Sequence, residues 1–331
     1  MRNPAAMAWM ALLVACGVTI LLGTGGDSMS ATYYPHRSLE AREQYYAHYD
    51  EQAQRWPVEY QEQTVDTSFG STFIRVSGPE DAPPLVLVPG DTDTSLSWIP
   101  FIEELSANHR TFAIDHVYDY GRSVRTRPMK RPEDFVTWLD EVLISLGLER
   151  TDLMSYSYGS WQASMYALAH PERIRKLILI APAATVEPPS IYVVLRAVLQ
   201  DLFPTRSIMT SYMYWLCEDE VRLGGQSKAT VDQLIDELLF SRKCYVRRRF
   251  VMPTNLSDEE WAALALAVPT LCIAAENDKT HNAPRAIERL IKVAPALETE
   301  MVEGIGHQGF AILKADWVTE RALRFLEDTD S

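Results

Sequence analysis

Hydrophobic residues along this chain fall into two patterns, short continuous runs and longer stretches with helical spacing. Runs rich in β-branched or aromatic residues predict strands, and they lie at 71–76, 85–88, 111–114, 152–156, 177–180, 270–275 and 298–302. Apolar residues recurring on one helical face predict helices, at 135–146, 161–170, 284–293 and 315–326. Continuous apolar strands separated by helices indicate an α/β fold, with a mostly parallel central sheet and helices on both faces.

A helical block interrupts this alternation. From 186 to about 254 no run is typical of a strand, and helices are predicted at 191–203, 208–218 and 230–246. Parallel sheets bind ligands beyond the carboxyl ends of their strands, so an insertion here predicts a helical cap over that edge. The predicted division is an N-terminal segment at 1–31, a core at 32–185, the cap at 186–264 and the rest of the core at 265–331. A further helix with buried tyrosines is expected within 33–57.

Length and charge limit the classes of function. With 331 residues, 47% of them hydrophobic, the chain is long enough for one large domain with an insertion or for two modest domains. The 31 basic and 45 acidic residues give a net charge of -14. This charge argues against binding to nucleic acid or to an anionic membrane surface. Nothing in the sequence decides the oligomeric state.

The N-terminus predicts a targeting segment. Arg2 precedes an uncharged run at 5–22, which a glycine-rich stretch at 23–26 follows. Such a run is typical of a signal peptide or of a membrane anchor, and its length suits either. The stretch ending at Cys16 also resembles a bacterial lipoprotein box, which makes lipidation of that cysteine a third interpretation. We therefore expect an exported or membrane-anchored protein of a bacterial cell envelope, with possible membrane attachment through this segment.

The remaining cysteines are Cys217, Cys244 and Cys272. Cys272 lies in an apolar run and is expected to be a buried thiol. Cys217 and Cys244 could form a disulfide in an exported protein, or stay free. No spacing of cysteine and histidine is typical of a zinc site, so we expect neither a metal nor a cofactor.

One sharp turn carries the strongest chemical signal. The pattern small-x-Ser-x-Gly is centred on Ser157, between a predicted strand and a predicted helix. A turn of this kind lifts the serine hydroxyl above the sheet, where it acts as a nucleophile. Ser155 stands where the pattern normally has its first glycine. The alternative interpretation is a serine in an ordinary tight turn.

A serine nucleophile needs a base and a carboxylate that orients it. His307 follows the last predicted strand among glycines and is the preferred base over His116 and His281. Asp278 follows the strand at 270–275 and is preferred over Glu276, because a short side chain must lie a few residues beyond the strand before it turns inward.

Acyl transfer also requires hydrogen-bond donors for the developing oxyanion. We assign the backbone N–H groups of Tyr158, after the nucleophile, and Asp91, after the run Pro89-Gly90. The alternative for Pro89-Gly90 is a plain strand-ending turn. Candidate side chains of an acyl pocket are aromatic, and core packing is the alternative for each; they are Trp98, Phe310, Tyr212 and Trp215.

Taken together, these motifs resemble the α/β-hydrolase superfamily, and within it bacterial serine carboxylesterases with a helical cap. The resemblance covers about 57–326, and the order Ser157, Asp278, His307 is the order of that superfamily. It implies hydrolysis of small-molecule carboxylic esters through an acyl-enzyme intermediate, without a cofactor. A lactonase, a thioesterase or a carbon–carbon hydrolase with the same triad stays open. A non-catalytic ligand-binding protein also stays open, because Pro89 and Ser155 depart from the family pattern.

Overall fold

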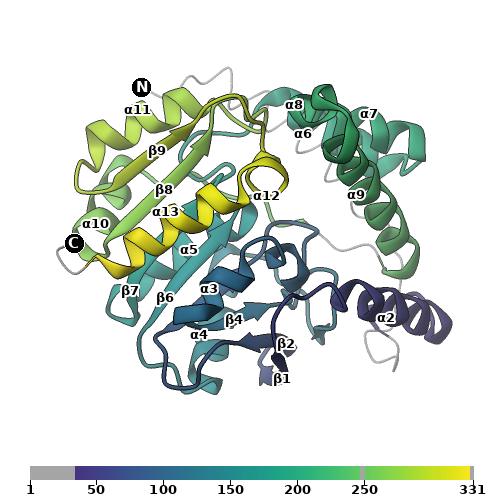
Figure 1. The fold of residues 1–331 in the computed structure, drawn as a ribbon, viewed down its shortest axis with the longest axis horizontal. Helices are drawn as coiled ribbons and strands as arrows, with labels where there is room; N and C mark the ends of the chain where they lie inside the picture. The colour runs from purple at the N-terminus through teal and green to yellow at the C-terminus, as the bar shows by residue number, and fades with distance from the viewer. Residues whose placement is uncertain (1–33, 247–249, 329–331) are drawn as a thin grey trace.

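Within residues 34–246 and 250–328, which the computed structural model describes, nine strands form one sheet at the centre of the protein (Figure 1). Their order across the sheet is β1-β2-β4-β3-β6-β7-β8-β9, and β5 pairs with β2. The strands are β1 (Tyr60–Thr67), β2 (Gly70–Ser77), β3 (Pro84–Val88), β4 (Arg110–Ile114), β5 (Val124–Arg125), β6 (Thr151–Tyr156), β7 (Ile174–Ile180), β8 (Thr270–Ala275) and β9 (Glu298–Val302).

Strand direction places the carboxyl ends of the central strands at one edge. The strand β2 is antiparallel to β1 and β4, whereas β4, β3, β6, β7, β8 and β9 pair in parallel. The strand β6 lies in the middle, with Leu87 opposite Met154 on one side and Leu179 opposite Ser155 on the other. All residues of β6 are buried, as expected for a strand covered on both faces.

Helices cover both faces of this sheet. One core cluster joins it to α4 (Pro132–Ser145), α5 (Tyr158–Ala169), α10 (Asp258–Ala267) and α11 (Ala283–Val293). The other face packs against α3 (Ile102–Asn108) and α13 (Ala315–Glu327), with the short α12 (Gly309–Leu313) at its end. Figure 1 shows α3 and α13 in front of the strands. The helices α4 and α11 present apolar stripes at helical spacing, which explains why the sequence predicts them.

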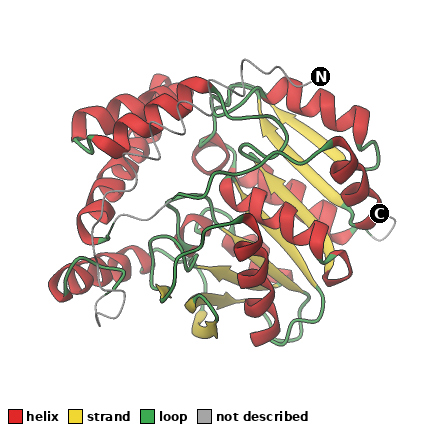
Figure 2. Cartoon of the chain, turned by 180° about the vertical axis from the view of Figure 1, so that it is seen from behind, coloured by secondary structure: helices red, strands yellow, loops and turns green. Residues whose placement is uncertain are grey.

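The insertion between β7 and β8 forms a separate group of helices. It comprises α6 (Ile191–Leu202), α7 (Arg206–Leu216), α8 (Glu218–Leu223) and α9 (Gly225–Cys244). These helices lie beyond one end of the sheet (Figures 1 and 2). They have a small core of their own that includes Met209, Met213, Val231 and Ile235. The insertion thus contributes little to the main cores and can overhang the edge of the sheet.

The N-terminal helix α2 (Leu39–Ala53) packs beside α9. Tyr45 and Tyr49 are buried in a cluster that includes Phe73 and Tyr245. The tyrosine-rich stretch predicted at 33–57 is therefore a helix that joins the cap to β2.

The structure confirms the α/β fold and each strand expected from the sequence, but it adds elements. The strand β1 was not expected because it lies at the edge and buries only Val65. The helix α10 packs against α5 and α11, so the cap boundary expected at 264 falls inside a helix of the core face. The expectations for 1–31 lie outside the described residues. No helix of the described chain is both long and apolar enough to cross a membrane.

Candidate active site

Ser157 occupies the sharp turn between β6 and α5. Its backbone has φ 52° and ψ -115°, a left-handed conformation that non-glycine residues adopt rarely and that concentrates at functional sites. The second small position of the motif, two residues after Ser157, requires glycine, because a Cβ on Gly159 would lie 2.3 Å from the Pro89 carbonyl oxygen. The tight approach of α5 to the end of β3 therefore fixes the second small residue of the motif.

The structure gives a reason for the serine at the first small position. Ser155 is fully buried, and its Oγ donates to the Ile178 carbonyl oxygen at 3.0 Å and lies 3.2 Å from the Ser160 Oγ. A buried hydroxyl is tolerated when it is hydrogen-bonded. The replacement of glycine by Ser155 is thus compatible with an intact sharp turn at Ser157.

Three side chains from separate parts of the chain meet above this turn. His307 Nε2 lies 2.8 Å from Ser157 Oγ, and His307 Nδ1 lies 2.6 Å from Asp278 Oδ2. Asp278 and His307 are both buried. Asp278 Oδ1 accepts two further hydrogen bonds from the amide and hydroxyl of Thr280. This is the geometry of a nucleophile, a base and an orienting carboxylate.

Electrostatics favour an ion pair at this site. Burial alone would raise the pKa of Asp278, but the charge of His307 and their hydrogen bond hold it well below its usual range. Burial alone would lower the pKa of His307, but Asp278 outweighs this effect and raises it. Opposite charges in hydrogen-bond contact favour the charged form of each partner. The pair therefore favours a positively charged imidazole, the form that follows proton transfer from the serine.

The rival residues occupy other environments. His116 accepts the Tyr118 amide at Nδ1 and packs on the Trp138 ring at 4.1 Å. His281 lies beside Asp278, but at 3.9 Å, and its Nδ1 lies 2.9 Å from the Thr280 hydroxyl. Glu276 accepts the Gly304 amide and so ties the two loops together.

The segment after β3 passes close to the serine. A Cβ on Gly90 would lie 3.4 Å from the Ser157 Cβ and 2.9 Å from Asp93 Oδ2. Thr92 has a left-handed φ of 64° and donates its amide to Asp119 at 2.7 Å. Asp91 lines the same cavity as Ser157. Tyr158 begins α5, with its phenol bonded to the Val251 carbonyl oxygen.

A cavity of about 410 Å³ opens in front of Ser157 and His307. Two of the aromatic candidates, Trp98 and Tyr212, line it. Phe310 and Trp215 are absent from the lining. Phe310 is fully buried against Tyr156, because α12 turns it toward the core beneath the site. The prediction that Phe310 and Trp215 line the acyl pocket is therefore wrong. Phe310 packs in the core and Trp215 packs within the cap.

Two acidic side chains near the site were not predicted from the sequence. Asp93 lines the cavity, and burial, followed by the charges of Asp119 and Asp91, raises its pKa to about 7. Glu220 of α8 is fully buried, with its Oε1 2.6 Å from where a Cβ on Gly309 would lie. Neither has a local sequence signal, because only the folded chain brings these loops and α8 to His307.

The three cysteines of the described chain are free and buried, so Cys217 and Cys244 do not form a disulfide. They belong to different packing clusters, one inside the cap and one beneath α2. Among the described residues, no group of histidine, cysteine and acidic side chains has the arrangement of a metal site.

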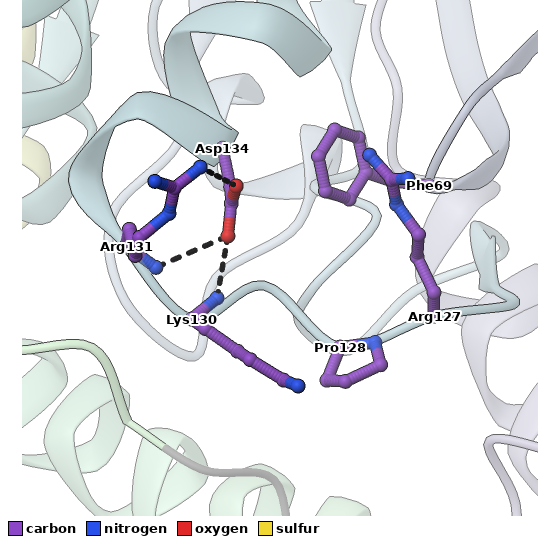
Figure 3. A pocket seen from close by; sticks show the side chains of 6 residues that line it. All are labelled: Phe69, Arg127, Pro128, Lys130, Arg131 and Asp134. Carbon is purple, nitrogen blue, oxygen red and sulfur yellow. Dashed lines mark hydrogen bonds and ion pairs between the residues drawn. The ribbon is translucent and has the colours of Figure 1, made fainter.

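A second hollow lies on the surface at the start of α4 (Figure 3). It shares no lining residue with the cavity at Ser157. Its charges are mostly satisfied locally, because Asp134 accepts the amides of Lys130 and Arg131, and Arg127 stacks on the Phe69 ring. This hollow therefore gives no sign of a second reaction centre.

Comparison with known proteins agrees with this architecture. A family model described as alpha/beta hydrolase fold matches residues 83–207. The crystal structure of naproxen esterase (carboxylesterase NP) from Bacillus subtilis has a TM-score of 0.77 and 27% identity, covering 87% of this chain and 99% of that one. This chain has the α/β-hydrolase fold.

The relatives of this hydrolase include a named esterase. Carboxylesterase YbfK of Bacillus subtilis (strain 168) is 29% identical over 297 residues, which cover 87% of this chain and 95% of that protein. The crystal structure of carboxylesterase CesB (YbfK) from Bacillus subtilis has a TM-score of 0.76 and 27% identity, and it covers 87% of this chain and 99% of that one. The match extends over nearly the whole of these relatives and supports hydrolase activity.

Proposed function

We propose that this hydrolase cleaves carboxylic esters through an acyl-enzyme intermediate on Ser157. The single observation that carries the proposal is the continuous hydrogen-bonded contact from Ser157 Oγ to His307 and from His307 to Asp278. The carboxylesterases of Bacillus subtilis that resemble the chain support an ester as the substrate class.

In the proposed reaction, His307 Nε2 takes the proton of Ser157 Oγ as the oxygen attacks the ester carbonyl carbon. The tetrahedral oxyanion accepts hydrogen bonds from the backbone N–H groups of Tyr158 and Asp91. His307 then gives its proton to the departing alcohol, which leaves the acyl group on Ser157. Water, deprotonated by His307, attacks the acyl-enzyme and releases the acid. Asp278 orients the imidazole and stabilises its charged form throughout.

The cavity also supports a preference among esters. Its lining includes apolar side chains, among them Trp98, Met213 and Leu216, together with the carboxylates of Asp91 and Asp93. Negative charge on these side chains, which Asp93 carries fully only above its pKa of about 7, repels an anionic substrate. We therefore expect small or medium neutral esters to react faster than esters of the same size that carry a carboxylate.

The test combines substitution with covalent labelling. Ser157→Ala should abolish hydrolysis of p-nitrophenyl acetate and butyrate, and the variant should not react with a fluorophosphonate probe. Ser164→Ala is a matched control on the same helix, because Ser164 Oγ donates to the Ser160 carbonyl oxygen outside the cavity; it should keep both properties. Full activity in Ser157→Ala would refute the nucleophile, and labelling without ester turnover in the wild type would point to another acyl substrate.

A further inference from the structure

The cap helix α6 carries an apolar face that the described chain leaves uncovered. Large apolar residues recur on it at helical spacing, with exposed fractions from 42% at Val198 to 68% at Tyr192. Every residue of α6 is at least partly exposed to solvent. We call this set the α6 face; it consists of Ile191, Tyr192, Leu195, Val198, Leu199 and, directly after the helix, Phe203. Contiguous exposed apolar surface of this kind is typical of an interaction site.

The charged residues of the same helix point to the cap. Arg196 stacks over the Trp215 ring at 4.8 Å. Asp201 faces Arg242 at 3.9 Å, and Arg242 also donates to the Gln200 carbonyl oxygen at 3.0 Å. The α6 face itself is therefore free of charge. An amphipathic helix with apolar residues on one face and charged residues on the other is typical of the boundary between water and an apolar phase.

The α6 face lies near the place where the N-terminal segment joins the described fold. His36 forms a bridge with Tyr245 just after α9, and the Arg37 side chain donates to the Arg242 carbonyl oxygen. Arg242 in turn contacts the end of α6 through Gln200. The chain before residue 34 contains the uncharged run 5–22. A run of this composition and length has affinity for a bilayer, and the described chain that follows it begins, at residue 34, near the end of α6.

The helix also borders the candidate active site. Gln200 lines the cavity in front of Ser157, whereas its neighbours Val198 and Leu199 are exposed to solvent. The helix α6 thus separates the cavity from the α6 face, and an apolar phase on that face would lie next to the wall of the cavity.

We propose that the α6 face binds to the surface of a lipid bilayer, with its side chains in the interfacial region. The net charge of -14 opposes an anionic surface. Binding therefore depends on apolar contact, and zwitterionic lipid suffices. The proposal does not require the proposed ester hydrolysis.

Brominated-lipid quenching tests this contact in the full chain. The variant Tyr192→Trp places a fluorophore on the α6 face, and Ile144→Trp places one at a similarly exposed position on α4, where Ile144 is 57% exposed. With vesicles of brominated phosphatidylcholine, Tyr192→Trp should lose fluorescence relative to unbrominated vesicles, beyond the loss in the wild type. Ile144→Trp should not, and the loss should persist in high salt. Equal fluorescence of Tyr192→Trp in the two kinds of vesicle would overturn the proposal.

A second copy of the chain is the competing occupant. Sedimentation velocity without lipid should give the same mass for the wild type and for Leu195→Ser. In the Tyr192→Trp background, Leu195→Ser should reduce the quenching, whereas Leu266→Ser on α10, where Leu266 is 84% exposed, should leave it unchanged. A dimer that Leu195→Ser converts to a monomer would assign the α6 face to self-association and overturn the proposal.

Discussion

At the scale of single residues, Asp93 beside the site has an unusual ionisation. Its carboxyl has a pKa of about 7, because burial and the charges of Asp119 and Asp91 disfavour the anion. Burial lowers the pKa of His307, but Asp278 and, to a smaller extent, the charge of Asp93 raise it. The titration of the proposed base is therefore tied to that of Asp93.

The substitution Asp93→Asn should move the acid limb of the pH profile of kcat/KM to lower pH. His307 must be neutral to accept a proton, and removal of a nearby negative charge lowers the pKa of an imidazole. Glu40→Gln on the exposed side of α2 is the control and should leave the profile in place. An unchanged acid limb in Asp93→Asn would show that the two groups do not interact.

The same substitution should stabilise the fold at alkaline pH. Because the pKa of Asp93 is raised on folding, the folded state keeps a proton between about pH 4 and pH 7 that the unfolded state has lost. The contribution of Asp93 to the free energy of unfolding therefore falls as the pH rises through this window. Thermal unfolding should give Asp93→Asn the higher Tm above about pH 7, and the difference should shrink toward about pH 4. A difference that grows on acidification would contradict this sign.

At the scale of elements, α8 joins the cap to the two loops of the site. Three consecutive acidic residues make these contacts. Glu218 pairs with Lys279, and Asp219 Oδ2 accepts the Asn277 side-chain amide at 2.8 Å. Glu220 is buried against the loop of His307, next to Gly306 and Gly309. The loops that carry Asp278 and His307 thus pack against a helix of the cap.

Loss of one of these contacts should slow the reaction without removing a reacting group. Asp219→Ala should lower kcat by about tenfold, because small displacements of reacting groups are costly, with a smaller change in KM. Asp236→Ala removes a surface pair with Arg206 on the cap and serves as the control. Equal kcat values for the wild type and Asp219→Ala would show that the loops hold their geometry without α8.

The start of the helix α10 is expected to affect stability but not activity. Ser257 and Glu260 form a capping box at its start, and no residue of α10 lines the cavity. Ser257→Ala should cost about 1 kcal/mol of the free energy of unfolding, measured by urea denaturation. The values of kcat and KM should stay unchanged in the folded protein. A lower kcat in fully folded Ser257→Ala would show that α10 also affects catalysis.

At the scale of the whole molecule, the thiols of the described chain are shielded. Burial raises the pKa of Cys272 to about 12, and it also raises the pKa of Cys217 and Cys244. The thiolate is the reactive form. In an alkylation experiment with peptide mapping, these three cysteines should be unmodified in the native protein and fully modified in denaturant. Prompt modification of Cys217 or Cys272 without denaturant would mean that its surrounding core opens.

Much of the fold was predictable because its signals are local. The strands of the central sheet are continuous apolar runs, and the sharp turn at Ser157 has a short motif between a strand and a helix. The strand β1 was not predictable, because an edge strand with one buried residue has a mostly polar sequence. The positions of His307 and Asp278 relative to predicted strands made them the preferred base and acid. Their contacts could not be predicted in the same way, because His307 lies 29 positions from Asp278 and 150 positions from Ser157.

The sequence by itself determined the type of fold, the place of the insertion and the serine at the turn, since each follows from periodicity or from a few adjacent residues. Only the tertiary structure decided which aromatic side chains face the cavity, where Trp98 and Tyr212 lie in the lining and Phe310 lies in the core. It alone brought Asp93 and Glu220 to His307 and left the α6 face exposed. The physical reason is that burial of a side chain depends on the elements packed around it, which come from distant parts of the chain.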